Sequence, residues 1–326
     1  MRGLQMKSGI IAFLLFSSAA TAGEVWVTNE KGNSVSVIST ETLEVVNTYP
    51  TGERPRGLVF SEDFSRLYIS TSDRNVVQVM DPHTGEVLHE LPSGEDPGQF
   101  VRHPNDRHLY IANEDDATTT VVDVITRDVI ARISVGIEPE GMAVSPNGKI
   151  AVTTSESTNI VHWIDTTSHE IFANSLVDNR PRHAEFRGDG TELWVSSEIG
   201  GTITIFDTET RMEKAKIEFE IPGVESELLM PVGFEFSKGE THAFVALSRA
   251  NHLAVVNTDT YLVEDYILVG RRVWHLAFNG DRSLLFTTNG VSSDVTVVDV
   301  ATRKPLKSIK VGRYPWGAAW RALPTD

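Results

Sequence analysis

Arginine, histidine and tryptophan side chains recur at fixed places in a repeated phrase built around proline. The phrase reads GERPRGLVF at 52–60, GEDPGQFVR at 94–102, GIEPEGMAV at 136–144 and DNRPRHAEF at 178–186. Beside this proline, or beside Val273 that takes its place in one repeat, or two positions after either, stand the side chains best suited to bind a ligand: Arg54, Arg56, Arg180, Arg182, His183, Arg272, Trp274, His275 and Trp316. Guanidinium groups offer planar forks for carboxylates, and indole rings offer flat faces for an aromatic ring. If the phrases meet in space, this pattern predicts a pocket for an anionic aromatic ligand.

Carboxylates in the same repeats give a second interpretation of these arginines. Acidic residues stand within the phrase or at the end of the strand that follows it: Glu30, Asp73, Asp96, Glu114, Glu138, Glu140, Glu156 and Glu198. Charges on a crowded rim commonly pair with each other, and exposed pairs contribute little to stability. Pairing between neighbouring repeats is therefore the alternative to ligand binding.

His183 and His275 raise a further possibility. Two imidazoles near Glu156 or Glu198 could ligate a divalent metal, as in a metal-dependent hydrolase or lactonase, or a haem iron. Counted along the chain, we place these histidines in repeats four and seven, which are not neighbours, so the pair would have to reach across a central channel. A hydrogen-bonded histidine at the rim is the alternative.

Motifs of catalysis are missing from the sequence. It contains no G-x-S-x-G elbow, no H-E-x-x-H pair, no P-loop and no EF-hand loop. The segment RHPNDRH at 102–108 looks ligand-like, but it spans an expected turn and is interpreted as solvated surface. We therefore assign no catalytic residue, no metal and no cofactor, and we expect a protein that is not an enzyme.

The spacing of the phrase indicates an internal repeat. Its prolines are Pro55, Pro97, Pro139, Pro181, Pro231 and Pro315, with Val273 at the remaining position. The intervals are 42, 42, 42, 50, 42 and 42 residues, so the long interval contains an insertion of about eight residues around 217–229.

Each repeat reads as four short strands. In the second repeat these are 56–60, 66–71, 75–80 and 86–91, rich in β-branched and aromatic residues and separated by turn residues. A period in the low forties with four antiparallel strands is typical of a β-propeller blade. Glycine usually stands two places after the proline, where inner strands crowd the axis, and Gln99, His183 and His275 replace it. These three replacements indicate the mouth of the channel.

The two ends of the chain decide the number of blades. The segment 24–29 reads as a second strand without a first strand before it, and 312–320 reads as a lone first strand at the other end. A closed ring removes exposed sheet edges. We therefore predict an all-β, seven-bladed propeller in a single domain over 23–326, with the first blade completed by the C-terminal strand.

Composition and charge limit the partners. The chain has 326 residues, no cysteine and a formal charge of −16. The absence of cysteine excludes disulfides, thiolate metal ligands and c-type haem attachment. The acidic balance opposes nucleic acid and anionic membranes, which both need basic surfaces.

The first 22 residues resemble a secretory signal peptide. Arg2 and Lys7 precede a short apolar run, and small residues lead to Ala22. We expect cleavage between Ala22 and Gly23, which removes two positive charges and gives a mature charge of −18 (27 basic against 45 acidic residues). No apolar run reaches the length of about 20 residues that spans a membrane. The protein is expected to be periplasmic and monomeric.

Several segments resemble the YVTN family of β-propeller repeats, among them VWVTNEKGNSVSVIS at 25–39 and VTVVDVATRKPLKSIKVG at 295–312. The likeness covers essentially the whole mature chain. The start of the mature chain is similar to that of an exported subgroup called PQQ-dependent catabolism-associated β-propeller proteins. Membership implies an accessory protein beside systems that oxidise alcohols with pyrroloquinoline quinone (PQQ). It transfers no site residue.

These observations leave three hypotheses for function. The first is a non-enzymatic binding protein that serves quinoprotein alcohol oxidation, with PQQ, a flat tricarboxylate, as a possible ligand of the arginines and tryptophans. The second is the metal-dependent or haem-binding propeller that uses His183 and His275. The third is a platform that docks a periplasmic quinoprotein dehydrogenase or a transport component.

Overall fold

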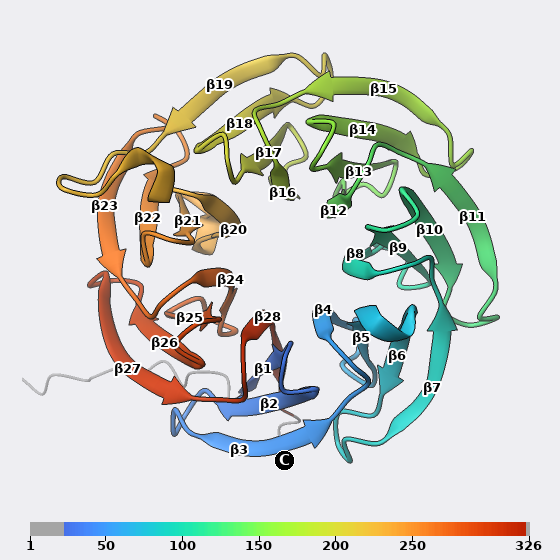
Figure 1. Cartoon of the computed structure of the whole chain (residues 1–326), viewed down its shortest axis with the longest axis horizontal. Coiled ribbons are helices and arrows are strands. Elements are labelled where there is room, and N and C mark those ends of the chain that lie inside the picture. Colours follow the sequence, from blue (N-terminus) through green and yellow to red (C-terminus); the bar gives the residue numbers. More distant parts are fainter. Residues whose placement is uncertain (1–22, 324–326) are drawn as a thin grey trace, which may run out of the picture.

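Seven four-stranded antiparallel sheets surround a central axis in residues 23–323, the part of the chain that the computed structural model describes (Figure 1). The predicted seven-bladed propeller is confirmed. The expected signal peptide, 1–22, and residues 324–326 lie outside the described residues.

The strands of each blade follow from the inside of the ring outward. Blade 1 contains β28 (Pro315–Ala322), β1 (Gly23–Asn29), β2 (Ser34–Ser39) and β3 (Val45–Pro50). Blade 2 contains β4 (Pro55–Phe60), β5 (Leu67–Thr71), β6 (Val76–Met80) and β7 (Val87–Pro92). Blade 3 contains β8 (Pro97–Arg102), β9 (His108–Asn113), β10 (Thr118–Asp123) and β11 (Val129–Ser134). Blade 4 contains β12 (Pro139–Val144), β13 (Ile150–Ser155), β14 (Ile160–Asp165) and β15 (Ile171–Leu176).

The remaining three blades repeat this order. Blade 5 contains β16 (Pro181–Phe186), β17 (Glu192–Ser197), β18 (Thr202–Asp207) and β19 (Glu213–Glu218). Blade 6 contains β20 (Pro231–Phe236), β21 (His242–Leu247), β22 (His252–Asn257) and β23 (Val263–Leu268). Blade 7 contains β24 (Val273–Phe278), β25 (Leu284–Asn289), β26 (Asp294–Asp299) and β27 (Lys304–Lys310). Three 3₁₀ turns are present in the described residues: η1 (Ser72–Arg74), η2 (Ser226–Leu228) and η3 (Lys238–Glu240).

The strands expected in the second repeat match β4 to β7 to within one residue at each end. The predicted insertion at 217–229 covers the end of β19 and the connection that contains η2. No helix in residues 23–323 has the length and apolar character to cross a membrane.

The core is divided among the seven interfaces between neighbouring blades. One of seven apolar clusters packs Trp26 and Val35 of blade 1 against Phe60 and Leu67 of blade 2, all 5% exposed or less. Strand residues alternate between the two faces of a sheet, and both faces of each blade are covered by neighbours, so the second and third strands are apolar on both sides.

Closure occurs as predicted within blade 1, where β28 lies beside β1 (Figure 1). Val25 pairs with Trp320 and Gly23 with Ala322 in an antiparallel register. The chain ends therefore meet in one sheet, and the ring of described residues has no open blade.

Side-chain hydroxyls of the second strand tie several blades to the inner strand of the next blade. Thr28 Oγ1 donates to the carbonyl of Arg56 at 2.7 Å, and Ser70 Oγ donates to that of Gly98 at 2.7 Å. Thr288 Oγ1 donates to the carbonyl of Trp316 at 2.6 Å across the last interface. These bonds give buried carbonyls of the inner strands a hydrogen-bond partner in the preceding blade.

A β-bulge follows the proline of the inner strands. In blade 2, Pro55 pairs with Thr71 but Leu58 pairs with Ile69, so β4 carries one extra residue. The bulge allows consecutive residues, Arg56 and Gly57, both to face the channel, which regular alternation forbids. The bulge therefore places the side chain of the residue after the proline closer to the mouth of the channel than the glycine position.

Candidate functional site

Backbone hydrogen bonds bring the predicted arginines to the carboxylates at the ends of the second strands. The carbonyl before each phrase proline accepts from the first residue beyond that strand. Glu198 N donates to the carbonyl of Arg180 at 2.8 Å, and Glu114 N donates to that of Asp96 at 3.0 Å. The residues beside the phrase prolines and the carboxylates at the ends of the second strands are far apart within a repeat, but these bonds place them side by side on one face of the propeller.

Asparagines of the preceding blade fix the same connections. Asn33 Oδ1 accepts from the amide of Arg54 at 3.1 Å, and Asn159 Oδ1 accepts from that of Arg180 at 3.0 Å. The arginines adopt positive φ angles, 55° at Arg54 and 61° at Arg180, which non-glycine residues seldom populate. The asparagine contact stabilises this backbone turn and holds each side chain over the channel.

Arg56 lies at the centre of one group of charges. It contacts Glu114 directly, and its Nε lies 3.4 Å from Glu30 Oε1. Arg54 adds a bond of 2.9 Å from Nη1 to Asp96 Oδ1. These carboxylates belong to blades 1 and 3 and the arginines to blade 2, so the ion pairs join neighbouring blades.

Arg182 lies at the centre of the second group and is buried. It contacts Glu156 directly, and its Nη2 lies 3.5 Å from Glu140 Oε1. The half-exposed Arg180 reaches Glu156 at 3.0 Å and Glu198 at 3.1 Å. Arg272 Nη2 approaches the same Glu198 at 3.1 Å.

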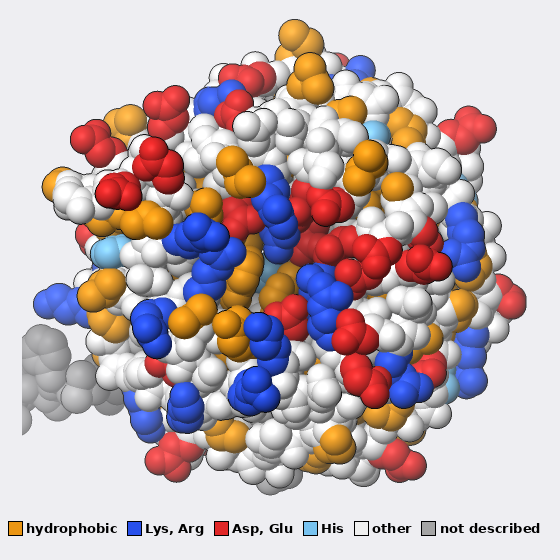
Figure 2. Space-filling view, viewed as in Figure 1, with side chains coloured by type: hydrophobic (Ala, Val, Ile, Leu, Met, Phe, Trp, Pro, Cys, Tyr) orange, Lys and Arg blue, Asp and Glu red, His pale blue; other side chains and the backbone are white. Residues whose placement is uncertain are grey.

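These two groups form the arginine mouth, defined as Arg54, Arg56, Arg180, Arg182, Arg272 and the seven carboxylates within 4.0 Å of them: Glu30, Asp73, Asp96, Glu114, Glu140, Glu156 and Glu198. Figure 2 shows these positive and negative side chains interleaved around the central depression. Five guanidinium groups face seven carboxyl groups. The structure thus contains the pairing that the sequence offered as the alternative, and a tricarboxylate such as PQQ does not fit this charge balance.

The predicted tryptophans both lie against arginines of the mouth. The Arg272 guanidinium lies 4.4 Å from the ring centre of Trp274. Trp316 is 3% exposed, and its ring centre lies 5.8 Å from the Arg56 guanidinium and 4.1 Å from the ring centre of His275. Trp316 also lines the cavity below the mouth. Ligand binding by these residues stays a prediction.

Glu114 is a carboxyl group of the arginine mouth with a strongly raised pKa. Burial, followed by the neighbouring Glu140, raises the pKa of Glu114 from about 4.5 to about 8. Glu140 is fully buried, and neither of its oxygens accepts a hydrogen bond from another described residue. A proton on Glu114 supplies the hydrogen bond that Glu140 otherwise lacks.

We predict that Glu114→Gln stabilises the protein at pH 8 and changes its stability little at pH 5. The folded state retains a proton between pH 4.5 and 8 that the unfolded chain releases, so the free energy of unfolding falls as pH rises through this range. Glutamine mimics the protonated side chain at every pH. Melting temperatures at pH 5, 6.5 and 8 measure the effect, with exposed Glu95→Gln as the control. An equal shift at pH 5 and pH 8 would contradict this assignment.

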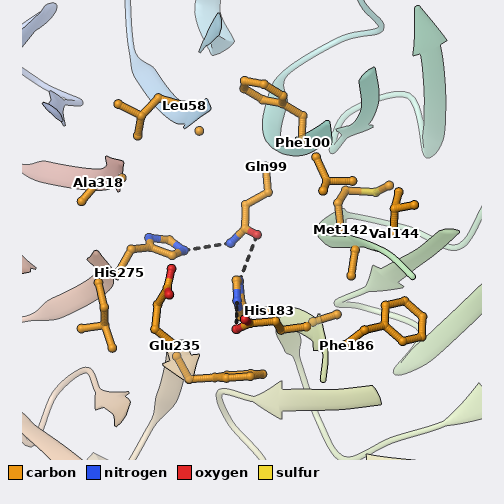
Figure 3. Close-up of a pocket in the computed structure, with 18 of the residues that line it drawn as sticks. Leu58, Gln99, Phe100, Met142, Val144, His183, Phe186, Glu235, His275 and Ala318 are labelled. Atoms are coloured by element: carbon orange, nitrogen blue, oxygen red, sulfur yellow. Dashed lines mark hydrogen bonds and ion pairs between the residues drawn. The ribbon is translucent and has the colours of Figure 1, made fainter. Parts of the chain in front are cut away.

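Below the mouth, Gln99, His183 and His275 form a polar layer across the channel (Figure 3). His275 Nδ1 faces the carbonyl of Trp316 at 3.0 Å and must donate to it, so its Nε2 accepts from Gln99 Nε2 at 2.8 Å. Gln99 Oε1 then accepts from His183 Nδ1 at 3.2 Å. One carbonyl therefore fixes the tautomers of both histidines and the orientation of the amide.

Both histidines of the polar layer are neutral. Burial lowers the pKa of His183 to about 4. Burial, and then the neighbouring His183, lower that of His275 to about 3.

His183 belongs to blade 5, so its predicted placement in repeat four was wrong. The N-terminal half-repeat counts as blade 1, which moves His183 from the fourth to the fifth blade. The expectation that the pair meets across the channel holds, with ring centres 6.1 Å apart.

Residues 23–323 contain no group of three or more His, Cys, Asp and Glu side chains arranged to hold a metal ion. Both ring nitrogens of His275 are engaged, by Trp316 and by Gln99. The metal and haem hypotheses find no support in this arrangement.

On the far side of the polar layer lies a cavity of about 290 Å³, the channel cavity. Its apolar walls come from the inner strands and include Leu58, Phe100, Met142, Val144, Phe186 and Phe234. Gln99, His183 and His275 line the end nearest the mouth, and none of the mouth arginines lines it. Figure 3 shows Gln99 between the two histidines and Glu235 pointing into the same space.

Glu185 and Glu235 are polar side chains of this cavity that the sequence analysis missed. Each stands two residues after the glycine position of its phrase, on β16 and β20. The corresponding residues of the other blades are all small and apolar: Val59, Val101, Ala143, Ala277 and Ala319. The two-residue period of a strand, applied to each phrase, would have found this ring and its two acids.

Comparisons with known proteins support the fold. No protein-family model matches the chain, and no curated protein matches it. A chain of Kuenenia stuttgartiensis hydrazine synthase is 16% identical, with a TM-score of 0.78, over 90% of this chain and 99% of that one. A functionally unknown protein from Desulfotomaculum acetoxidans is 16% identical, with a TM-score of 0.78, over 91% and 98%. A candidate 6-phosphogluconolactonase from Bacteroides fragilis is 17% identical, with a TM-score of 0.77, over 94% and 99%.

At this level of identity, the likeness shows the propeller fold alone. The resemblance to the YVTN family and to the PQQ-associated subgroup remains a prediction.

Proposed function

We propose that this chain is a non-enzymatic binding protein that holds a small molecule in the channel cavity. The observation that carries the proposal is the combination of apolar walls with a polar end. Ligand sites are typically concave, mostly apolar and equipped with a few placed polar groups. The volume of about 290 Å³ lies at the lower end of the range for small-molecule sites.

The polar layer supports the same proposal because it gives the cavity a fixed end. Gln99 and His275 are each 9% exposed or less, and their hydrogen bonds leave one tautomer and one amide orientation. A side chain held in this way loses little entropy when a ligand contacts it. The cavity is thus preorganised at the end that the mouth covers.

The proposal includes export and an accessory role beside PQQ-dependent alcohol oxidation. This part of the proposal is supported by the order of basic, apolar and small residues in 1–22, which is typical of a signal peptide, and by the resemblance of the repeats to the exported subgroup. The charge balance of the arginine mouth makes PQQ itself a poor ligand there. The accessory role is therefore proposed to act through another small molecule.

Binding to the channel cavity is tested with N-phenyl-1-naphthylamine, an apolar fluorophore that is uncharged at pH 7. We expect saturable one-to-one binding to residues 23–326, with affinity reduced at least tenfold in Val101→Trp. Val101 lines the cavity, and an indole there occupies the space of the probe. PQQ should not displace the probe. Fluorescence titration at constant ionic strength measures each affinity.

Val46→Trp is the matched control, because it makes the same exchange on the outer strand β3 at a residue that is 46% exposed. It should bind the probe as the unmodified protein does. Melting curves of both variants establish that each is folded. Absence of saturable binding, or equal binding by folded Val101→Trp, would overturn the proposal.

A further inference from the structure

Two adjacent blades break the apolar ring of the channel cavity with carboxylates. Glu185 of blade 5 and Glu235 of blade 6 both line the cavity. The other five blades have valine or alanine at the equivalent position, and of these Val101 and Ala143 also line the cavity. The Glu185 and Glu235 side chains are 31% and 33% exposed, and that surface faces the narrow channel. A ligand in the cavity can therefore reach both carboxyl groups.

The charges around these carboxyl groups do not balance. Arg282 Nη1 lies 3.6 Å from Glu235 Oε2, while it also donates to the carbonyl of Phe236. The nearest basic group to Glu185 Oε2 is His183 Nε2 at 4.0 Å, and His183 is neutral. When both carboxyl groups are ionised, two carboxylates face one arginine, which leaves room for one further positive charge.

The other charged groups near the pair do not remove this imbalance. Glu240 of η3 adds negative charge toward Glu185. Arg187 is paired with Glu240 at 3.5 Å and with Glu192 at 3.8 Å, so its charge is already matched. With Glu185 and Glu235 ionised, the local excess is therefore negative.

The apolar walls complement a cation with an organic body. Phe100, Phe186 and Phe234 line the cavity, and aromatic rings attract cations as well as apolar groups. Two further pockets adjoin the cavity. One shares Glu185, and the other shares Glu235. Both carboxyl groups thus stand where a bound molecule would pass from the cavity to the surface.

We propose that the channel cavity takes an organic monocation, an amine with an aromatic or apolar body, whose ammonium group lies between Glu185 and Glu235. This inference rests on the proposed function, in which the same cavity is the ligand site. The ammonium supplies the positive charge that the pair lacks, and the phenylalanines pack against the body. An organic anion is disfavoured by the same two carboxyl groups.

Binding of the amine displaces protons. Burial raises the pKa of Glu235 to about 7 and, together with Glu235, holds the pKa of Glu185 well above its usual range. An ammonium nearby favours the ionised carboxylates, so the pair releases protons when the cation enters. Affinity for the amine therefore falls as pH is lowered from 8 to 6, because the carboxyl groups then hold their protons.

The test compares benzylamine, a cation at pH 7, with its neutral analogue benzyl alcohol, by calorimetry on residues 23–326. We expect benzylamine to bind at least tenfold more tightly at pH 7.5, and we expect its advantage to shrink at pH 6. In two buffers of different ionisation enthalpy, the measured heats should differ by the protons released. The double variant Glu185→Gln/Glu235→Gln should lose the preference, and exposed Glu209→Gln should keep it.

Binding of N-phenyl-1-naphthylamine separates the two proposals. If the probe binds but benzylamine and benzyl alcohol bind equally, or if the double variant keeps the preference, the amine proposal is wrong and the binding function stands. If neither the probe nor benzylamine binds, both are wrong. Retained probe binding by the double variant shows that it is folded, and it makes a lost preference attributable to the carboxyl groups.

Discussion

Deletion of residues 312–326 is expected to abolish the cooperative thermal unfolding of this protein. The deletion removes β28, which forms the inner strand of blade 1 and pairs with β1. Trp316 is 3% exposed and Arg321 is 4% exposed, so both leave buried sites. Truncation of a single buried tryptophan costs about 3–5 kcal/mol, while a whole domain is stable by about 5–15 kcal/mol. Loss of the entire strand therefore exceeds what the ring can tolerate.

A circular permutant is the control for this deletion. Ala322 and Gly23 are register partners, so a two-residue turn of asparagine and glycine can join them, with new ends opened before Gly312. This chain keeps every blade intact and should melt cooperatively, close to the unmodified protein. Circular dichroism on heating measures both. A truncated protein that melts like the permutant would show that closure by β28 does not stabilise the ring.

Arg182→Met is expected to lower the free energy of unfolding by about 3–5 kcal/mol, the range for removing one partner of a buried ion pair. Burial by itself would lower the pKa of Arg182, but Glu140, Glu156 and Glu198 outweigh burial and raise it. Methionine fills a similar volume without the charge. The three carboxylates then face each other in a site from which water is largely excluded, as the 6% exposure of Arg182 indicates.

Arg180→Met is the matched control because Arg180 contacts Glu156 and Glu198 as well, but its side chain is 41% exposed. Its loss should cost about 0–1 kcal/mol, as for exposed pairs. The double variant Arg182→Met/Glu140→Gln should recover part of the loss, since it also removes the fully buried carboxylate. Urea unfolding measures all three. If Arg180→Met and Arg182→Met lower the free energy of unfolding equally, burial of the Arg182 ion pairs does not increase their contribution to stability.

The number of blades could be predicted from the sequence because each blade repeats the same short pattern of strand and turn residues. The prolines at intervals of 42 residues, with β-branched runs between turns, define one four-stranded unit after another. The half-repeat at 24–29 and the lone phrase at 312–320 then leave closure as the arrangement without an open sheet edge. Strand pairing within a blade is local, so it follows from patterns that lie close together in the chain.

The candidate site could be predicted only in part, because it depends on which blades face each other across the axis. The sequence showed that Arg182 and Glu140 stand in neighbouring repeats, but their burial follows from the bulge and from the crowding of seven inner strands. Gln99 and His275 were noticed as departures from glycine. Their direct hydrogen bond joins blades 3 and 7, which no spacing along the chain encodes.

The sequence by itself determined the fold, the closure of the ring and the chemical types of the residues that face the axis, since strand pattern and turn chemistry are local properties. The tertiary structure decided which charges neutralise each other, which histidine tautomers exist and where the cavity lies. Those features depend on distances across the channel between residues as far apart as Gln99 and His275, and distance and burial set the strength of their interactions.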